Sequence, residues 1–229
     1  MTILGIETSS PLGSLALRRD DRCLEERFLP ALARRGTRIL VPEIMAFLRR
    51  HDLRPADLDA VAVSIGPGGF TGLRVGLTCA KTLAWANGAS LVAVDTFQAV
   101  AENVPSEESV AVIVDGQRRG VLLGIMSRTR GGGWERLGPF EMVRREELRD
   151  RISGVAMLSG SGLMGLDVGL IHGVPIAPRP LWLPRAAVVA RIGEDRFRRG
   201  DIDDPLTIEP RYARRSAAEE QRDERSTFG

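Results

Sequence analysis

Residues 64–77 read Ser-Ile-Gly-Pro-Gly-Gly-Phe-Thr-Gly-Leu-Arg-Val-Gly-Leu, directly after the apolar run Ala60–Val63. The apolar run predicts a buried strand and the segment Thr71–Trp85 predicts a helix, so the glycines form a strand-to-helix turn. Glycine takes positive φ without a Cβ clash, and the backbone N–H groups of such a turn can converge on one point. The unpaired N–H groups at the helix start also favour an anion. The turn is therefore a candidate site for a phosphate or a carboxylate.

The alternative is a purely structural turn, in which Thr71 serves as the N-cap of the helix. The turn lacks the Lys-Ser/Thr ending of a P-loop. The glycines by themselves do not distinguish an anion site from a structural turn, so a second motif is needed to decide between them.

Two hairpins in the chain share one pattern: an apolar strand, a carboxylate at its end, a turn and a returning strand. The first comprises Ile3–Glu7, the turn Thr8–Gly13 and the strand Ser14–Arg18, and the second comprises Val110–Asp115 and Val121–Met126 around a turn. A duplicated half predicts two similar domains that face one cleft, with an acidic residue on each side. The alternative is coincidence, because strand-turn-strand hairpins are common.

The pattern of apolar residues predicts alternating strands and helices along the chain. We expect strands near 2–7, 14–19, 22–28, 59–64, 90–94, 109–115, 121–127 and 155–159, and helices near 38–51, 71–87, 95–103, 144–151 and 185–199. The length of 229 residues fits one domain or two of about a hundred each, and the duplicated hairpin favours two, at 1–104 and 105–212. Residues 213–229 are charged and poor in apolar side chains, which predicts a flexible or partner-ordered tail.

Composition argues against several classes of function. The formal net charge is only +2, Lys81 is the only lysine, and the arginine pairs are scattered, which does not fit the basic stripe of a nucleic-acid-binding protein. No apolar run is long enough to span a membrane. The two cysteines, Cys23 and Cys79, lie in apolar segments and are expected in the core, without a disulfide. These features predict a cytoplasmic protein.

The sequence offers little for metal or nucleophilic catalysis. His51 and His172 are the only histidines, and neither has a second ligand at metal-binding spacing. No Gly-x-Ser-x-Gly motif frames a serine. A kinase mechanism would need acidic groups around the phosphate loops, which Glu7 and Asp115 supply. The alternative role of both carboxylates is to accept hydrogen bonds from the N–H groups of their own turns.

The helix predicted after the glycine turn has an unusual surface. Small residues recur every four positions, at Gly72, Gly76, Ala80 and Ala84, so another segment can approach closely along that stripe. Apolar side chains cover most other directions, which indicates that the helix is covered on several sides. Burial inside the chain explains this pattern, and so does an apolar patch for a partner. Both explanations can hold on different faces.

The order of these motifs resembles that of the actin, sugar-kinase and Hsp70 ATPase superfamily. Within it, Gly66–Gly76 resembles the signature of the TsaB (YeaZ) family, as do Ile3–Ser10 and Pro210–Arg214. The resemblance covers roughly residues 1–215. It implies an α/β fold of the actin-like (ribonuclease H-like), duplicated two-domain ATPase type, with mixed sheets flanked by helices.

The resemblance also implies a function. A member of this family is expected to be a bacterial, noncatalytic accessory subunit of the complex that transfers threonylcarbamoyl to the adenosine beside the tRNA anticodon. Its partner is a catalytic TsaD-like homologue, which it scaffolds and activates. A TsaE-like ATPase and a homodimer through the same helices remain open as further partners, and tRNA is expected to bind only indirectly. Without its own metal site, the chain is not expected to be a metalloprotease or an enzyme on its own.

Two sets of site residues follow from this resemblance. No cofactor is firmly implied, but ATP or ADP at or near the partner interface remains open, with candidate cofactor-binding residues Glu7, Thr8, Ser9, Gly66, Gly68, Gly69, Thr71 and Asp115. The partner interface is expected on the helices 39–48 and 71–85, through Ile39, Ile44, Leu48, Leu73, Leu77, Ala80, Lys81 and Trp85. No catalytic or metal-binding residues are predicted.

The chain departs from the family pattern at positions that weaken an independent nucleotide site. Arg35-Gly36-Thr37-Arg38 stands where relatives tend to have Asn-His-Ser, and the second hairpin reads Asp115-Gly116-Gln117-Arg118-Arg119-Gly120-Val121-Leu122, which lacks a second glutamate and a tyrosine. Gly69 replaces a serine. A stand-alone small-molecule kinase or ATPase that uses Glu7 and Asp115 remains the alternative function.

Overall fold

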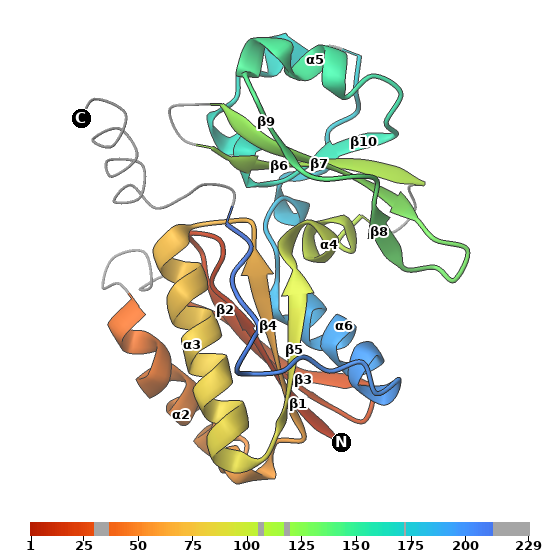
Figure 1. Ribbon diagram of the computed structural model, residues 1–229. Helices are drawn as coiled ribbons and strands as arrows, with labels where there is room; N and C mark the ends of the chain where they lie inside the picture. The colour runs from red at the N-terminus through yellow and green to blue at the C-terminus, as the bar shows by residue number, and fades with distance from the viewer. Residues whose placement is uncertain (30–36, 105–107, 117–119, 172, 213–229) are drawn as a thin grey trace, which may run out of the picture.

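The computed structural model describes residues 1–29, 37–104, 108–116, 120–171 and 173–212 (Figure 1). The strands are β1 (Thr2–Glu7), β2 (Ser14–Arg19), β3 (Arg22–Phe28), β4 (Ala60–Gly66), β5 (Ser90–Asp95), β6 (Ser109–Asp115), β7 (Val121–Arg128), β8 (Trp134–Arg136), β9 (Glu141–Val143) and β10 (Met157–Ser159). The α-helices are α2 (Leu40–Arg50), α3 (Phe70–Asn87), α4 (Thr96–Ala101), α5 (Leu148–Arg151) and α6 (Ala186–Arg198). The expected elements are confirmed, and the short strands β8 and β9 are additional.

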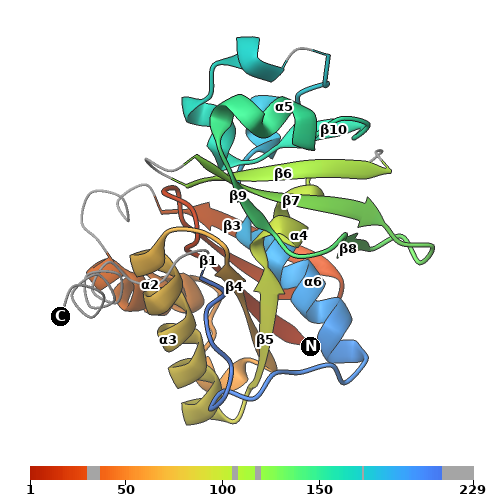
Figure 2. The ribbon, with the colours of Figure 1, turned by 45° about the horizontal axis from the view of Figure 1, so that its top comes forward.

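The first sheet has the order β3-β2-β1-β4-β5. β1 pairs antiparallel with β2 and parallel with β4, and β4 pairs parallel with β5. Every residue of β1 and β4 is buried, so both faces of these strands are covered by other elements. Leu4 and Ile6 pack with the residues of α2 and α3, whereas Ile3 packs with α6 on the opposite face. Figure 2 shows α2 and α3 on one side of this sheet and α6 on the other.

The second sheet has the order β10-β6-β7-β8, and β9 also pairs with β7. Helix α4 packs on one face of this sheet, with Phe97 in the core, and α5 packs on the other face through Leu148. Because α4 also contacts β4 and β5, it lies between the two sheets (Figure 1). Two mixed sheets flanked by helices confirm the fold class expected from the sequence.

Helix α6 follows the second sheet in the chain but packs against β1, β2 and β4 of the first. Two glycines allow this close approach: a Cβ at Gly5 would lie 2.4 Å from the carbonyl oxygen of Ala186, and one at Gly193 would lie 2.4 Å from Cβ of Ala62. The domain boundaries at 104 and 212 remain a prediction. The segment that they assign to the second half nevertheless contributes α6 to the first sheet.

Cys23 lies on the edge strand β3 and is exposed, not in the core as its sequence context predicted. The first three residues of β3 are all exposed, so neither face of the strand is covered at this end. Cys79 is buried in α3 as expected, and burial raises the pKa of its thiol to about 11. Within the described residues, none of the helices combines the length and the apolar character that a membrane span requires. The segment 30–36, the turn 117–119 and the predicted tail 213–229 lie outside the described residues.

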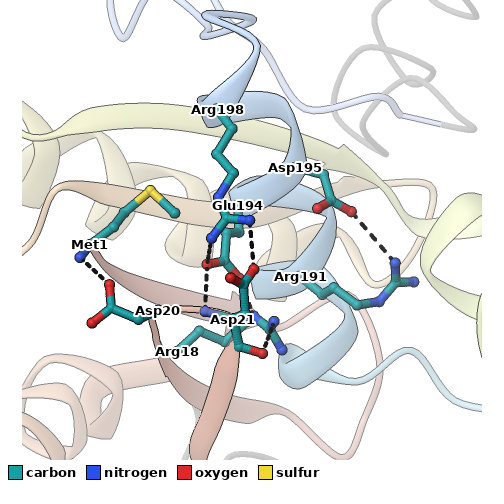
Figure 3. Close-up of polar contacts among 8 residues, drawn as sticks. All are labelled: Met1, Arg18, Asp20, Asp21, Arg191, Glu194, Asp195 and Arg198. Atoms are coloured by element: carbon teal, nitrogen blue, oxygen red, sulfur yellow. Dashed lines mark hydrogen bonds and ion pairs between the residues drawn. The ribbon is translucent and has the colours of Figure 1, made fainter.

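An ion cluster fastens α6 to the β2–β3 hairpin (Figure 3). Glu194 is buried, and its carboxylate accepts a hydrogen bond from Arg18 at 2.6 Å and another from Arg198 at 3.0 Å. It also accepts one from the backbone N–H of Asp21 at 3.1 Å. Since Arg18 is itself largely buried, each member of this cluster depends on the others for its charge balance.

We expect Glu194→Gln to lower the free energy of unfolding by about 3 kcal/mol, because it leaves the buried guanidinium of Arg18 without a counter-charge. Urea denaturation followed by circular dichroism measures this. Asp20→Asn is the control, because Asp20 is an exposed partner of the terminal amine in the same hairpin and should change stability little. Equal effects of the two substitutions would contradict this account of the cluster.

Candidate functional site

The glycine turn lies at the carboxyl end of β4, where Gly66 has a φ of 113° and the Gly66–Pro67 peptide is cis. Helix α3 begins at Phe70, and its N-cap is Gly69, which offers no side-chain cap. The reading of Thr71 as the N-cap is therefore wrong: the helix starts earlier, and Thr71 is exposed in its first turn.

The turn packs directly on the first hairpin. The N–H of Gly69 donates to the carbonyl oxygen of Ser9 at 2.7 Å, and the hydroxyl of Thr8 donates to the carbonyl of Gly72 at 2.8 Å. A Cβ at Gly68 would lie 2.5 Å from the Ser9 carbonyl oxygen, and clashes with Thr8 would be more severe at Gly72 and Gly76. The two glycines of the small-residue stripe on α3, Gly72 and Gly76, thus accommodate the hairpin of the same chain, whereas Ala80 and Ala84 lie in the core.

Glu7, at the end of β1, is fully buried and organises the turn that follows it. Its Oε1 accepts hydrogen bonds from the N–H and the hydroxyl of Ser9, both at 2.6 Å, and from the N–H of Ser10 at 3.1 Å. Burial raises the pKa of Glu7, opposed by hydrogen bonding from Ser64, Ser9 and Ser10. This is the turn-capping role that the sequence offered as the alternative to phosphate chemistry.

Asp115, the second predicted acid, lies at the end of β6 and is exposed. Its carboxylate pairs with Arg145 at 3.3 Å. The burial of the two acids therefore differs: Glu7 is enclosed by its own turn, whereas Asp115 faces solvent. Of the candidate cofactor-binding residues of the first half, Ser9 meets Gly68 and Gly69 of the glycine turn, and Glu7 is bonded to Ser9. Gly66 lies against Arg211, and Thr71 is exposed.

Most of the residues predicted at the partner interface lie in the core of this chain. Ile44, Leu48, Leu73, Leu77 and Ala80 are buried between the helices and the first sheet. Apart from Ile44, these side chains line no surface of the described chain, so Leu48, Leu73, Leu77 and Ala80 cannot meet a partner while the helices keep their place. Ile39 and Lys81 are half-buried, and Trp85 has 77% of its surface exposed.

The helices do present an apolar surface, in a groove between α2 and α3 with a volume of about 360 Å³. We call it the α2–α3 groove, and it is lined by Val41, Ile44, Met45, Arg74, Val75, Thr78, Cys79, Thr82 and Leu83. Val41 is 55% exposed. Of the predicted interface residues only Ile44 lines this groove. The sequence analysis did not predict Val41 and Met45 at this surface. Their spacing of four residues, at the edge of the apolar face of α2, is the sequence signal that could have identified them.

The sequence also missed the way the C-terminal segment closes over α3. Arg74 donates through Nε to the hydroxyl of Tyr212 at 2.9 Å and lies 4.6 Å from the ring centre of Phe70. The rings of Phe70 and Tyr212 lie 4.9 Å apart. These contacts hold the segment that resembles the family's Pro210–Arg214 motif beside the glycine turn, as far as residue 212.

No cluster of three or more potential metal ligands occurs among the residues that the structure describes. His51 contacts the carboxylate of Glu25 at 2.8 Å and the ring of Phe47 edge-on. His172 lies outside the described residues.

Two mixed sheets, joined through a central helix and each opened by an acid-bearing hairpin, define an actin-like α/β protein. The family described as TsaD, tRNA N6-adenosine threonylcarbamoyltransferase, matches residues 28–133. The structure of YeaZ from Pseudomonas aeruginosa superposes with a TM-score of 0.75 at 23% identity, covering 92% of this chain and 99% of that one. This likeness confirms the fold.

Two sequence relatives carry the name TsaB. The tRNA threonylcarbamoyladenosine biosynthesis protein TsaB of Bacillus subtilis is 32% identical over 143 residues, which is 62% of each chain. The TsaB of Escherichia coli is 25% identical over 225 residues, 95% of this chain and 96% of that protein. The match thus spans less than two thirds of the Bacillus subtilis relative. The chain is thus similar in sequence to proteins named TsaB and in fold to proteins named YeaZ, as its motifs indicated.

We expect Gly72→Ala to lower the free energy of unfolding by about 1–3 kcal/mol, even though alanine favours a helix, because its Cβ would lie 2.0 Å from the Thr8 carbonyl oxygen. Thermal denaturation measures the loss. Gly131→Ala is the control, because the nearest atom would lie 3.9 Å away. An unchanged or raised melting temperature for Gly72→Ala would refute the packing described here.

The raised pKa of Glu7 predicts a pH-dependent difference between the wild type and Glu7→Gln. The folded state keeps the proton where the unfolded chain, with an ordinary glutamate pKa near 4.3, has lost it. The stability from this residue is therefore full below about pH 4 and is lost as the pH rises through the raised pKa. Glutamine stays neutral, so the variant should gain stability relative to the wild type as the pH rises.

Urea unfolding at about pH 5 and about pH 8 measures this difference, and the slope cannot exceed about 1.4 kcal/mol per pH unit for one proton. Glu135→Gln, an exposed glutamate, is the control and should follow the wild type at both values. A constant offset between Glu7→Gln and the wild type at both pH values would show that Glu7 is already ionised in the folded chain.

Proposed function

We propose that this chain is a noncatalytic accessory subunit in the biosynthesis of threonylcarbamoyladenosine on tRNA, and that its α2–α3 groove docks a catalytic TsaD-like homologue. The relatives named TsaB support the process. The single structural observation that supports docking is the apolar groove, open to solvent between the two helices. Binding there would stabilise the active shape of the partner.

The lining of the α2–α3 groove suits a protein partner. Six of its nine lining side chains are apolar, and burial of exposed apolar surface by a partner is favourable. A groove between two helices is the shape that accepts a helix of another chain. Arg74 and the hydroxyl-bearing residues Thr78 and Thr82 provide polar groups at its margin, which can fix the orientation of the partner.

A second copy of this chain can compete for the same groove, since identical apolar surfaces pair isologously. The exposed ring of Trp85, at the far end of α3, would extend either interface. A TsaE-like ATPase as a further partner, indirect tRNA contact, ATP or ADP near the interface and a cytoplasmic location are parts of the same proposal.

The alternative of a stand-alone kinase or ATPase has less support. Such an enzyme needs carboxylates that reach a metal-bound phosphate. Glu7 is instead enclosed by its turn and accepts hydrogen bonds from Ser9 and Ser10. The N–H of Gly69, at the centre of the proposed anion loop, is bonded to Ser9.

The proposal predicts that Val41→Asp weakens association with the TsaD-like homologue of the same organism by at least about tenfold, because it places a charge in the apolar groove. Val41 lies in the first turn of α2, where a carboxylate suits the helix N-terminus, so the fold should persist. Isothermal titration calorimetry measures the affinity. A buried position such as Leu77 is unsuitable for this test, because a charge there would unfold the chain.

The matched control is Leu206→Asp, which adds the same charge at an apolar side chain that is 83% exposed and does not line the groove. It should bind like the wild type. Wild-type affinity for Val41→Asp, with the homologue itself active, would exclude the groove as the docking surface. Deletion of the gene tests the process separately: threonylcarbamoyladenosine in bulk tRNA should fall by mass spectrometry, and unchanged levels would exclude the proposed function.

A further inference from the structure

A second cavity, of about 370 Å³, lies between the two sheets and has a different character from the α2–α3 groove. Asp95 and Gln98 line it from the end of β5 and from α4, Trp134 and Arg136 line it from β8, and Arg211 lines it from the segment after α6. Three parts of the chain that are far apart in sequence thus meet around one polar space. We call it the Asp95 pocket.

The charges of the Asp95 pocket do not balance. Oδ2 of Asp95 accepts a hydrogen bond from Nη1 of Arg136 at 3.0 Å and another from Nη1 of Arg211 at 2.8 Å. Its other oxygen accepts from the N–H of Phe97 at 2.8 Å and so caps α4. One carboxylate therefore serves two guanidinium groups, and the three charged side chains that line the cavity carry one net positive charge.

Both arginines retain donors for a further acceptor. A guanidinium has five N–H donors. The bonds to Asp95, and the bond from Nε of Arg136 to the carbonyl of Gly138 at 3.0 Å, use only part of them. Arg136 is held in place by these bonds and by the ring of Phe140, whose centre lies 5.3 Å away, so one of the two donors is preorganised.

The indole of Trp134 is a second, independent observation that points to a ligand. The residue is 5% exposed, it lines the Asp95 pocket, and its Nε1–H has no acceptor among the described residues. A buried N–H without a partner costs free energy, and such groups in proteins usually meet water or a ligand. The amide of Gln98 adds a further polar group, and Met126 adds an apolar wall.

The Asp95 pocket also lies where the topology favours ligands. Asp95 is paired with Gly66 across β4 and β5, at the carboxyl ends of the parallel strands. Open α/β sheets bind their ligands outside this edge. The N–H of Arg211 donates to the carbonyl of Ile65 at 2.7 Å, which fixes the backbone of the C-terminal segment at the same edge.

We propose that the Asp95 pocket binds the oxyanion of a small molecule, a carboxylate or a phosphate group, between the guanidinium groups of Arg136 and Arg211. Guanidinium groups recognise both anions through paired hydrogen bonds. The volume is in the range of small-molecule sites, so the pocket has room for more than the anion itself, against Met126 and Trp134. A bound ligand would connect the first sheet, the second sheet and the C-terminal segment. This site is separate from the α2–α3 groove and does not depend on the proposed function.

The test is isothermal titration calorimetry of the full chain with three probes: inorganic phosphate, succinate and adenosine monophosphate. The probes distinguish a bare phosphate, a carboxylate and a phosphate attached to a larger body. We expect saturable binding of at least one probe, with one site per chain. Arg136→Gln and Arg211→Gln should each weaken it by about tenfold, the loss of one charge-assisted hydrogen bond. Arg149→Gln, an exposed arginine on α5, is the control and should bind like the wild type.

Asp95→Asn is expected to strengthen binding of the probe, whereas the arginine variants weaken it. Poor folding of the variant would weaken binding and so cannot explain a gain in affinity. Asparagine still caps α4, but it no longer neutralises the arginines. We expect the affinity for the same probe to rise by about tenfold. The inference is overturned if none of the probes binds saturably at millimolar concentrations, if Arg149→Gln weakens binding as much as the pocket variants do, or if Asp95→Asn fails to tighten it.

Discussion

The contact between the first hairpin and the start of α3 is the constraint on which the candidate site depends. The Thr8–Ser9 turn lies against Gly68, Gly72 and Gly76 so closely that a single added methyl group would collide with it. Glu7 fixes the shape of that turn from inside the sheet. Since α3 is positioned by this contact, the groove between α3 and α2 depends on it as well.

This arrangement divides α3 into faces with different roles. Gly72 and Gly76 meet the hairpin, Leu73, Leu77 and Ala84 fill the core, and Val75 and Thr78 line the α2–α3 groove. The other face of the first sheet is closed by α6, which the buried carboxylate of Glu194 holds to the hairpin β2–β3. An apolar surface therefore remains available only where no element of the described chain covers α2 and α3.

The sequence predicted the fold well because its signals are local. Apolar runs such as Ala60–Val63 mark buried strands, and the glycines after them mark the turn into α3. The sequence did not predict which side chains are buried where that burial depends on segments distant in the chain. The burial of Leu73 and Leu77 follows from the sheet beneath α3, and a periodic pattern shows that a side chain is apolar but not which neighbour covers it. From its position in the sequence, helix α6 was assigned to the second half, but in the structure it packs against the first sheet.

The candidate site was predicted in part for the same reason. Glu7, Ser9 and Gly69 are brought together as the motifs indicated, although Glu7 caps its turn. The Asp95 pocket was missed, since Asp95, Arg136 and Arg211 come from separate parts of the chain and each is unremarkable in its own segment. The same holds for Arg74 and Tyr212, whose contact joins residues 138 positions apart.

The central claim, that the protein acts by docking a catalytic homologue on the α2–α3 groove, is tested most directly by hydrogen–deuterium exchange. The chain is compared alone and mixed with a TsaD-like homologue, and peptides are read out by mass spectrometry. The account predicts slower exchange in α2 and α3, at residues 40–50 and 70–87, with little change in β6–β10. Slower exchange confined to the second sheet, or unchanged exchange in α2 and α3 at saturating partner, would contradict it.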